Sequence, residues 1–197
     1  MTGKLHHSEQ AGTQSFAFTA KNSQQAKIII ARYPQGRQQS AVMPLLMLAQ
    51  QQNGGWLPKA AMDTVAELLG MAPVRVYEVA SFYGMYNLEP VGRHVINVCT
   101  TTPCWLRGSD LIVKACEKHL AIRCGETTPD GAFTLREAEC LGACVNAPMC
   151  QVVNDKGQYF YEDLTAESVT KIIDGLFRGE QPKPGPQSKR KSSEPKN

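Results

Sequence analysis

The chain has 197 residues, of which 42% are hydrophobic and 20% charged, as is typical of a globular protein rather than a disordered or fibrous one. No apolar run approaches the ~20 residues that a membrane-spanning helix needs. The net charge of +3 resides in the C-terminal tail, because residues 181–197 carry +4 and residues 1–180 carry −1. This distribution gives no indication of nucleic-acid binding.

The composition of residues 1–21 predicts a disordered N-terminal segment. The segment has no apolar core, unlike a secretory signal peptide, and it contains Glu9 and no arginine, unlike a mitochondrial transit peptide. The adjacent His6 and His7 are more simply interpreted as solvated side chains than as a metal site.

The segment that precedes the first cysteine predicts a bundle of four helices. Ser23 is a suitable N-cap for the first helix. The second spans residues 37–52, with a kink or a late start at Pro44, because proline lacks the N–H that a helix interior requires. Pro58 and Pro73 suit the first turns of the third and fourth helices. The bundle is predicted to be a packing domain without chemistry of its own.

The hydrophobic pattern changes at His94, where residues 94–99 predict a β-strand that ends at Cys99. A loop holding Cys104 follows, and then a helix for which Ser109 is a suitable N-cap. The positions of this helix that are predicted to face inward are Leu111, Ile112, Ala115, Cys116, His119 and Leu120.

A second strand over residues 133–139 leads directly to Cys140. Residues 149–161 predict a β-hairpin around the turn residues 154–157, and Thr165 caps a final helix with clean helical spacing. The order strand, helix, strand, hairpin, helix matches the thioredoxin arrangement. Loops that follow parallel strands of a βαβ unit gather at one end of the sheet, so the segments after the two strands should lie close together.

Four cysteines lie in these two segments: Cys99 and Cys104 with four residues between them, and Cys140 and Cys144 with three. Four thiolates from two loops supply what a binuclear iron–sulfur cluster needs, two sulfurs for each iron. Structural zinc also takes four thiolates, but its ligand pairs are most often separated by two residues.

Disulfides and dithiol catalysis are less consistent with the sequence. Seven cysteines is an odd number, and the chain has no Cys-x-x-Cys pair. Three cysteines are predicted not to be ligands. Cys116 is predicted to be a core residue, Cys124 to lie in a polar loop, and Cys150 to be packed in a strand.

Several segments resemble the small iron–sulfur subunit of the NADH-dehydrogenase module of respiratory complex I. The resemblance extends over residues 23–187, and Gly84 departs from it at a position where relatives often carry threonine. The segments that carry it are Arg75–Tyr83, Thr101–Asp110, Gly125–Asp130, Glu139–Pro148, Tyr161–Thr165 and Pro182–Pro186.

This resemblance implies an α+β fold, in which a helical bundle precedes a thioredoxin-like ferredoxin domain. It implies one 2Fe–2S cluster held by Cys99, Cys104, Cys140 and Cys144. The implied partners are the flavoprotein subunit that binds FMN and NAD(H), and the large iron–sulfur subunit. The implied location is peripheral, on the cytoplasmic face of the bacterial inner membrane or the matrix side of the mitochondrial one. Related subunits serve NAD-reducing hydrogenases and formate dehydrogenases, and these remain alternatives, as does a zinc-stapled interaction module.

The predicted domains are therefore a disordered segment (1–21), a helical bundle (22–90), a 2Fe–2S domain (91–180) and an extended, basic, proline-rich tail (181–197). The tail would lie on a partner surface or stay solvated. A cis peptide bond is predicted at Ala147–Pro148, where thioredoxin-like folds place a cis proline before the hairpin.

Overall fold

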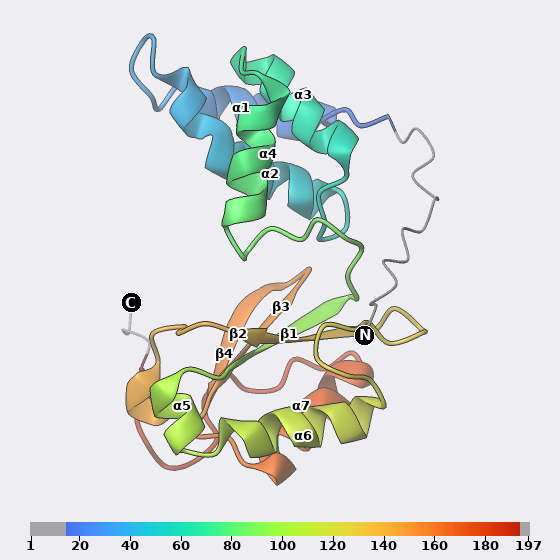
Figure 1. Cartoon of the computed structure of the whole chain (residues 1–197), viewed down its shortest axis with the longest axis vertical. Helices are drawn as coiled ribbons and strands as arrows, with labels where there is room; N and C mark the ends of the chain where they lie inside the picture. The colour runs from blue at the N-terminus through green and yellow to red at the C-terminus, as the bar shows by residue number, and fades with distance from the viewer. Residues whose placement is uncertain (1–14, 194–197) are drawn as a thin grey trace, which may run out of the picture. The chain divides into compact units, whose positions relative to one another are not determined.

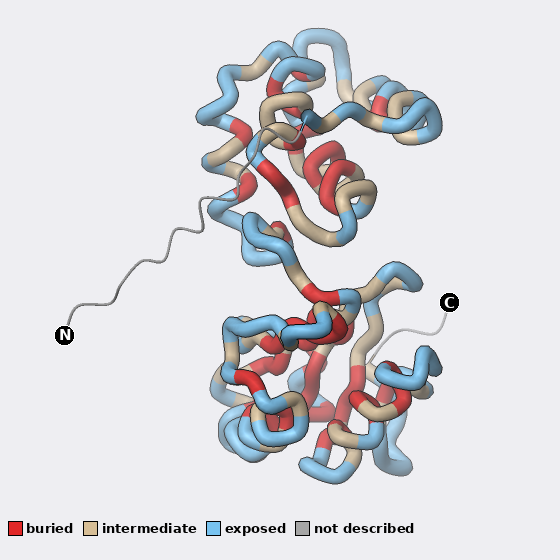
Figure 2. Tube along the Cα trace, turned by 90° about the vertical axis from the view of Figure 1, so that its right-hand side faces the viewer, coloured by how far each residue is buried: buried red, intermediate tan, exposed pale blue. Residues whose placement is uncertain are grey.

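A computed structural model describes residues 15–193 of the chain. The chain divides into two compact units, and the division falls between Pro90 and Val91. Buried residues concentrate inside each unit (Figure 2). The predicted His6–His7 pair and most of the predicted disordered segment lie outside the described residues. No helix in the described part of the chain is long and apolar enough to cross a membrane.

The described part of the first unit, residues 15–90, contains four α-helices and one short 3-10 helix (Figure 1). They share one hydrophobic core, which is built around Leu45, Leu46, Leu57, Val65 and Val76. The elements are α1 (Ala20–Ile30), η1 (Gln38–Ala41), α2 (Val42–Gln52), α3 (Lys59–Leu69) and α4 (Pro73–Phe82).

The start of α1 differs from the prediction. Thr19, not Ser23, is its N-cap, and the Thr19 hydroxyl accepts a hydrogen bond from the Asn22 backbone N–H at 3.3 Å. The preceding Phe16 and Phe18 pack against the helical core, so the packing of this unit includes residues before Ala20. The amphipathic pattern alone could not choose between two hydroxyl side chains four residues apart, since both suit an N-cap.

Prolines and a glycine mark the ends of the helices in this unit. Helix α2 begins at Val42 after the 3-10 turn, so Pro44 lies in its first turn, as the predicted late start requires. Pro73 is the first residue of α4, and Gly70 ends α3 with φ 59°, a left-handed conformation that glycine adopts without steric cost. Pro58 lies one residue before α3 rather than inside its first turn.

The second unit contains a five-stranded sheet in the order β2-β1-β3-β4-β5. Helices α6 and α7 lie side by side on one face of this sheet (Figure 1). The strands are β1 (His94–Cys99), β2 (Phe133–Ala138), β3 (Cys150–Asn154), β4 (Gly157–Glu162) and β5 (Gly185–Pro186), and the helices are α5 (Thr102–Leu106), α6 (Ser109–Leu120), η2 (Cys144–Asn146) and α7 (Ala166–Phe177).

Strands β1 and β2 are parallel and joined through α6, whereas β3 is antiparallel to both β1 and β4. This is the βαβ unit followed by a hairpin that the sequence predicted. Thr165 caps α7 and completes a capping box with Ser168. The Ala147–Pro148 peptide bond is cis, which confirms that prediction.

Helix α6 corrects two predictions. Gly108 is its N-cap and Ser109 its first residue, and the Ser109 hydroxyl is buried without a hydrogen-bond partner among the described residues. Leu111 and His119, which were predicted to face inward, are exposed, and His119 Nε2 lies 2.7 Å from Asp174 Oδ1. Val113, which the predicted inward positions did not include, is buried instead.

The C-terminal tail also differs from the prediction of a segment lying on a partner or in solvent. Residues 185–186 add a short parallel strand to the edge strand β4, and the Gln187 N–H donates to Glu162 O at 2.8 Å. The chain continues along the same unit as far as residue 193. Edge-strand backbone groups need partners, and the tail supplies them.

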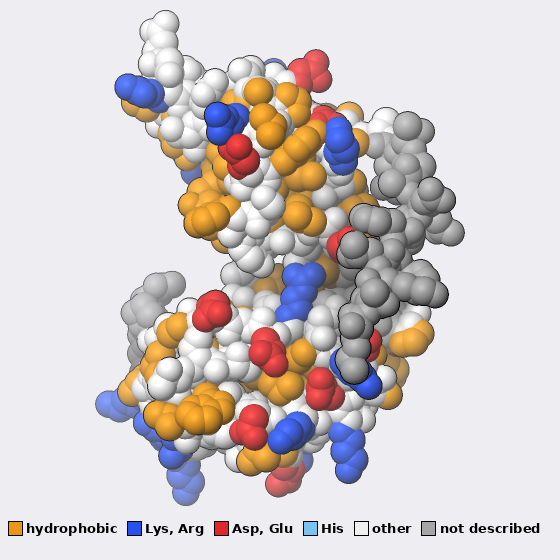
Figure 3. Space-filling view, in the orientation of Figure 1, with side chains coloured by type: hydrophobic (Ala, Val, Ile, Leu, Met, Phe, Trp, Pro, Cys, Tyr) orange, Lys and Arg blue, Asp and Glu red, His pale blue; other side chains and the backbone are white. Residues whose placement is uncertain are grey.

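Large apolar side chains are exposed on both units (Figure 3). Those on the helical unit include Val74, Phe82, Met85 and Leu88. Those on the sheet-containing unit include Trp105, Leu106, Leu111 and Val145.

Candidate metal centre

The sheet brings the two cysteine-bearing segments to the same end of neighbouring parallel strands. Cys99 is the last residue of β1 and is paired with Ala138, the last residue of β2, two residues before Cys140. Cys104 lies in the short helix α5, not in the predicted loop, and Cys144 begins the 3-10 turn η2. The geometry expected from a βαβ unit therefore places all four predicted ligands near the same end of the sheet.

The four thiols form two pairs. The Sγ atoms of Cys140 and Cys144 lie 3.4 Å apart. The thiols of Cys99 and Cys104 are hydrogen-bonded to each other. Two sulfur ligands about 2.3 Å from one tetrahedral metal ion would lie about 3.8 Å apart, so the measured separation is close to that of two thiolates on one metal.

The two pairs differ in their surroundings. Cys99 and Cys104 are buried in a small apolar cluster that also contains Ala143 and Met149, whereas Cys140 and Cys144 are exposed. The first pair is thus enclosed by protein, while the second faces solvent. Burial of this kind restricts the access of water to one side of a bound metal group.

Hydrogen bonds join the two loops at the thiols. The backbone N–H of Leu141 donates to Cys99 Sγ, and a backbone N–H at Met149 donates to Cys104 Sγ. The Cys99 N–H also donates to Met149 O at 3.1 Å. N–H groups aimed at sulfur are the means by which a protein tunes an iron–sulfur centre.

These contacts shift the pKa values of the two buried thiols in opposite directions. Burial disfavours the Cys99 thiolate, but the hydrogen bonds from Thr101, Cys104 and Leu141 outweigh it and lower the pKa of Cys99. Burial, together with the neighbouring Cys99, raises the pKa of Cys104 to about 12. A cation that takes both thiolates would remove this competition, because its charge replaces the shared proton.

Cys144 of the exposed pair also has a shifted pKa. The hydrogen bond with Cys140 raises the pKa of Cys144, because it stabilises the protonated thiol. Among residues 15–193, no group of three or more His, Cys, Asp or Glu side chains is arranged so that it could hold a metal ion. The arrangement on the described chain is one of two thiol pairs, and a donor set of two sulfurs for each of two metal ions fits it.

The other three cysteines occupy different surroundings. Cys116 and Cys150 are buried in the main core between the sheet and its helices, and Cys124 packs against that core. Burial raises the pKa of Cys116 to about 12 and of Cys124 to about 11, and it raises the pKa of Cys150 as well. That these three are not ligands stays a prediction.

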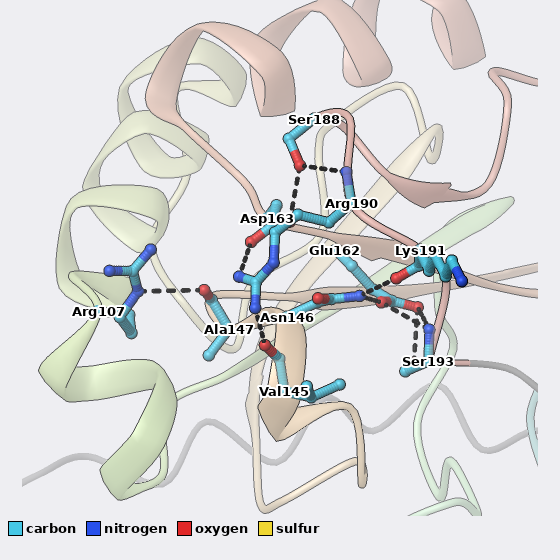
Figure 4. Close-up of polar contacts among 10 residues, drawn as sticks. All are labelled: Arg107, Val145, Asn146, Ala147, Glu162, Asp163, Ser188, Arg190, Lys191 and Ser193. Carbon is cyan, nitrogen blue, oxygen red and sulfur yellow. Dashed lines mark hydrogen bonds and ion pairs between the residues drawn. The ribbon is translucent and has the colours of Figure 1, made fainter.

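Sequence reasoning missed a group of residues behind the second cysteine pair. The side chains of Asn146, Glu162 and Arg190 contact the turn that contains Cys144 (Figure 4). The one signal in the sequence is that Glu162 directly follows the aromatic run Tyr159–Tyr161 at the end of its strand.

Comparison with known proteins agrees with this geometry. Residues 26–177 match the family described as thioredoxin-like [2Fe-2S] ferredoxin. NADH dehydrogenase [ubiquinone] flavoprotein 2, mitochondrial, of Dictyostelium discoideum is 52% identical over 179 residues, which cover 91% of this chain and 71% of that protein. The E subunit of the NADH-quinone oxidoreductase of Rickettsia conorii is 56% identical over 162 residues, which cover 82% of this chain and 95% of that protein.

A solved structure shares the fold at lower identity. A chain of an NAD+-reducing [NiFe]-hydrogenase in the air-oxidized state is 19% identical with a TM-score of 0.57, and the match covers 68% of this chain and 23% of that chain. Since the match spans less than a quarter of that chain, it supports the fold and not the activity.

Proposed function

Because the chain belongs to the thioredoxin-like [2Fe-2S] ferredoxin family, we propose that it is the small electron-transfer subunit of an NADH:quinone oxidoreductase. The observation that carries the proposal is the placement of two thiol pairs after neighbouring parallel strands. Sequence identities of 52% and 56% to subunits of NADH dehydrogenase [ubiquinone] and of NADH-quinone oxidoreductase support this assembly.

Cys99 and Cys104 would hold one iron of a 2Fe–2S cluster, and Cys140 and Cys144 the other. When bound, such a cluster supplies one-electron transfer. The chain's own part is to provide four thiolates, to direct the Leu141 N–H at Cys99 Sγ, and to cover the inner pair with apolar side chains. Hydride transfer would belong to FMN and NAD(H) in the partner subunit.

The flavoprotein subunit that binds FMN and NADH is the partner we propose, alongside the large iron–sulfur subunit. Trp105 and Leu106 directly follow Cys104 in the chain, and Val145 follows Cys144, and all three are exposed. Apolar side chains exposed beside a redox group are typical of a docking surface, and docking there would shorten the path for an electron.

The helical unit would be a four-helix bundle, spanning residues 22–90, that holds the assembly together, while residues 91–180 carry the cluster. Its exposed apolar residues, such as Phe82 and Val74, are available for this contact. The assembled protein would lie peripherally at the cytoplasmic face of a bacterial inner membrane, or at the matrix side of a mitochondrial one.

The experiment is to purify the chain alone and in complex with the proteins that co-purify with it, and to add NADH to each. We expect electron-spin resonance to detect a reduced 2Fe–2S cluster after NADH only in the complex that contains FMN, and after dithionite in both. Co-purification with a hydrogenase or formate dehydrogenase, with no quinone reductase activity, would contradict the assembly proposed.

A further inference from the structure

The C-terminal tail folds back behind the turn that contains Cys144 (Figure 4). We use "tail latch" for the contacts that Arg190, Lys191 and Ser193 make with Asn146, Val145, Glu162 and Asp163. The tail latch joins three segments that are far apart in the sequence: the turn η2, the end of β4 and the tail.

Arg190 is the first bridge. Its Nη1 donates to Asp163 Oδ1 at 2.9 Å, and its Nη2 donates to Val145 O at 2.7 Å. The Asp163 side chain is only 8% exposed, and the Ser188 hydroxyl donates to its second oxygen at 2.8 Å. One guanidinium therefore ties the backbone next to Cys144 to a largely buried carboxylate, and its rigid planar fork of donors suits this bridge better than a single ammonium group does.

Glu162 is the second bridge. It is fully buried, and its carboxylate accepts hydrogen bonds from Asn146 Nδ2 at 2.5 Å and from the Ser193 hydroxyl at 2.7 Å. The Asn146 amide also donates to Lys191 O at 2.7 Å. A buried carboxylate is destabilising unless donors surround it, so the tail completes a polar site that the rest of the unit leaves incomplete.

The turn that the tail latch holds is the segment that directly follows Cys144. On its other side the same segment is held more loosely, by Arg107 Nε donating to Ala147 O at 3.5 Å. Its carbonyl groups at Asn146 and Pro148 accept from the backbone N–H groups of Asp163 and Leu164, at 2.7 and 2.9 Å. Ala143, Ala147 and Met149 anchor the inner side of this loop in the apolar cluster around Cys99 and Cys104. The Cys140 and Cys144 side chains are exposed, so the polar contacts behind the turn fix its outer side.

We propose that the tail latch positions the outer thiol pair, Cys140 and Cys144, and thereby sets how firmly the cluster is retained and at what potential it accepts an electron. This inference rests on the proposed cluster site. Arg190 is a positioning residue, because it acts through the backbone of Val145 and touches none of the four thiols. The tail that its composition assigned to a partner surface would thus act within its own unit.

The variants are chosen to separate geometry from charge. Arg190→Ala removes the bridge, and Arg190→Lys keeps the charge but not the fork. Lys191→Ala removes the same charge from the neighbouring residue while keeping the carbonyl that Asn146 contacts, and so serves as the matched control. Ser193→Ala weakens the second bridge with little change in volume, which keeps a test available if Arg190→Ala fails to fold.

Three properties of the full-length chain are measured: hydrogen exchange of residues 141–148, the rate of iron release to a chelator, and the midpoint potential of the cluster. We expect Arg190→Ala to speed local exchange and iron release by about tenfold, as loss of a charged hydrogen bond implies, and to shift the potential. Arg190→Lys and Ser193→Ala should give smaller changes of the same kind, and Lys191→Ala none.

Two results would overturn the inference. One is unchanged exchange and iron release in Arg190→Ala and Ser193→Ala. The other is an equal shift of the potential in Arg190→Ala and Lys191→Ala, which would mean that charge alone acts. If the wild-type chain proves to hold no iron, the proposed cluster site fails, and this inference fails with it; a cluster that is present but insensitive to Arg190 removes this inference alone.

Discussion

The sulfur atoms of Cys140 and Cys144 lie 3.4 Å apart on an exposed loop, and the hydrogen-bonded thiols of Cys99 and Cys104 lie buried at the end of the adjacent strand. The sheet fixes the relation between the pairs, since the paired ends of β1 and β2 bring their loops together. The chain thus presents two pairs of thiols at one end of the sheet.

Replacing any one of these four cysteines with serine should abolish or distort the visible absorption of the cluster, because one iron loses a thiolate. The matched controls are Cys116→Ala, Cys124→Ser and Cys150→Ala, which should leave the spectrum unchanged. The alanines at positions 116 and 150 avoid placing a hydroxyl in a fully buried site. A spectrum lost in the Cys150 variant, with the fold intact, would overturn the assignment.

Gly92 is expected to tolerate no side chain. A Cβ at this position would lie 2.7 Å from the carbonyl carbon of Phe133, whose backbone belongs to the neighbouring strand. Gly92→Ala should therefore lower the free energy of unfolding by about 1–3 kcal/mol, since a well-packed sheet cannot move aside without cost. Urea unfolding measures the change.

Gly84→Ala provides the comparison for that substitution, because nothing lies within 4 Å of its added Cβ and its backbone does not require positive φ. It should leave stability within about 0.5 kcal/mol of the wild type. A Gly92→Ala protein as stable as Gly84→Ala would show that the β1–β2 contact is looser than described.

His94 should make the sheet-containing unit less stable in mild acid. Burial, aided by the charge of Arg93, lowers the pKa of His94 below its ordinary value of about 6.5, and its ring stacks on Phe133 with centroids 5.2 Å apart. The unfolded chain therefore binds the proton more readily than the folded one. Stability is full above the unfolded pKa and is lost as the pH falls through it toward the folded pKa.

Nuclear magnetic resonance of the histidine ring protons tests this directly, with a His94→Asn variant to assign the signal. The His94 pKa should lie below 6.5, and the variant should lose part of the decline in unfolding free energy between about pH 7 and 5. A His94 pKa above the ordinary value would reverse the sign and contradict the account.

If the chain serves the proposed assembly, loss of its cluster should leave hydride transfer intact. A Cys140→Ser variant that assembles with the flavoprotein should still support NADH oxidation by an artificial acceptor, because that reaction needs only the flavin site of the partner. The control is the wild-type assembly at equal flavin content. Abolished oxidation in the assembled variant would place the cluster on the obligatory path.

The sequence predicted the elements whose chemistry is local. The spacing of prolines and apolar residues located the helices, the capping threonine at position 165 started α7, and the two strands delivered the cysteines as expected. The start of α6 was predicted one residue too late. Gly108, in a left-handed conformation, and Ser109 are both plausible caps, and only packing decides between them.

The contacts of the C-terminal tail with its own unit were not predicted, for a different reason. Its prolines and lysines are typical of a solvated segment, and nothing in the composition shows that Glu162 is buried and needs donors. The contacts of Arg190 with Val145 and of Ser193 with Glu162 span 45 and 31 positions, and no hydrophobic or turn pattern in the sequence marks these polar partners. Long-range polar contacts of this kind require the folded structure.

The most direct test of the central claim is chemical analysis of the purified full-length chain, combined with electron-spin resonance after reduction by dithionite. The account predicts two iron and two acid-labile sulfide per chain, as the family's [2Fe-2S] description implies, and one reduced-cluster spin. One zinc ion per chain, with no sulfide and no spin signal, would contradict it.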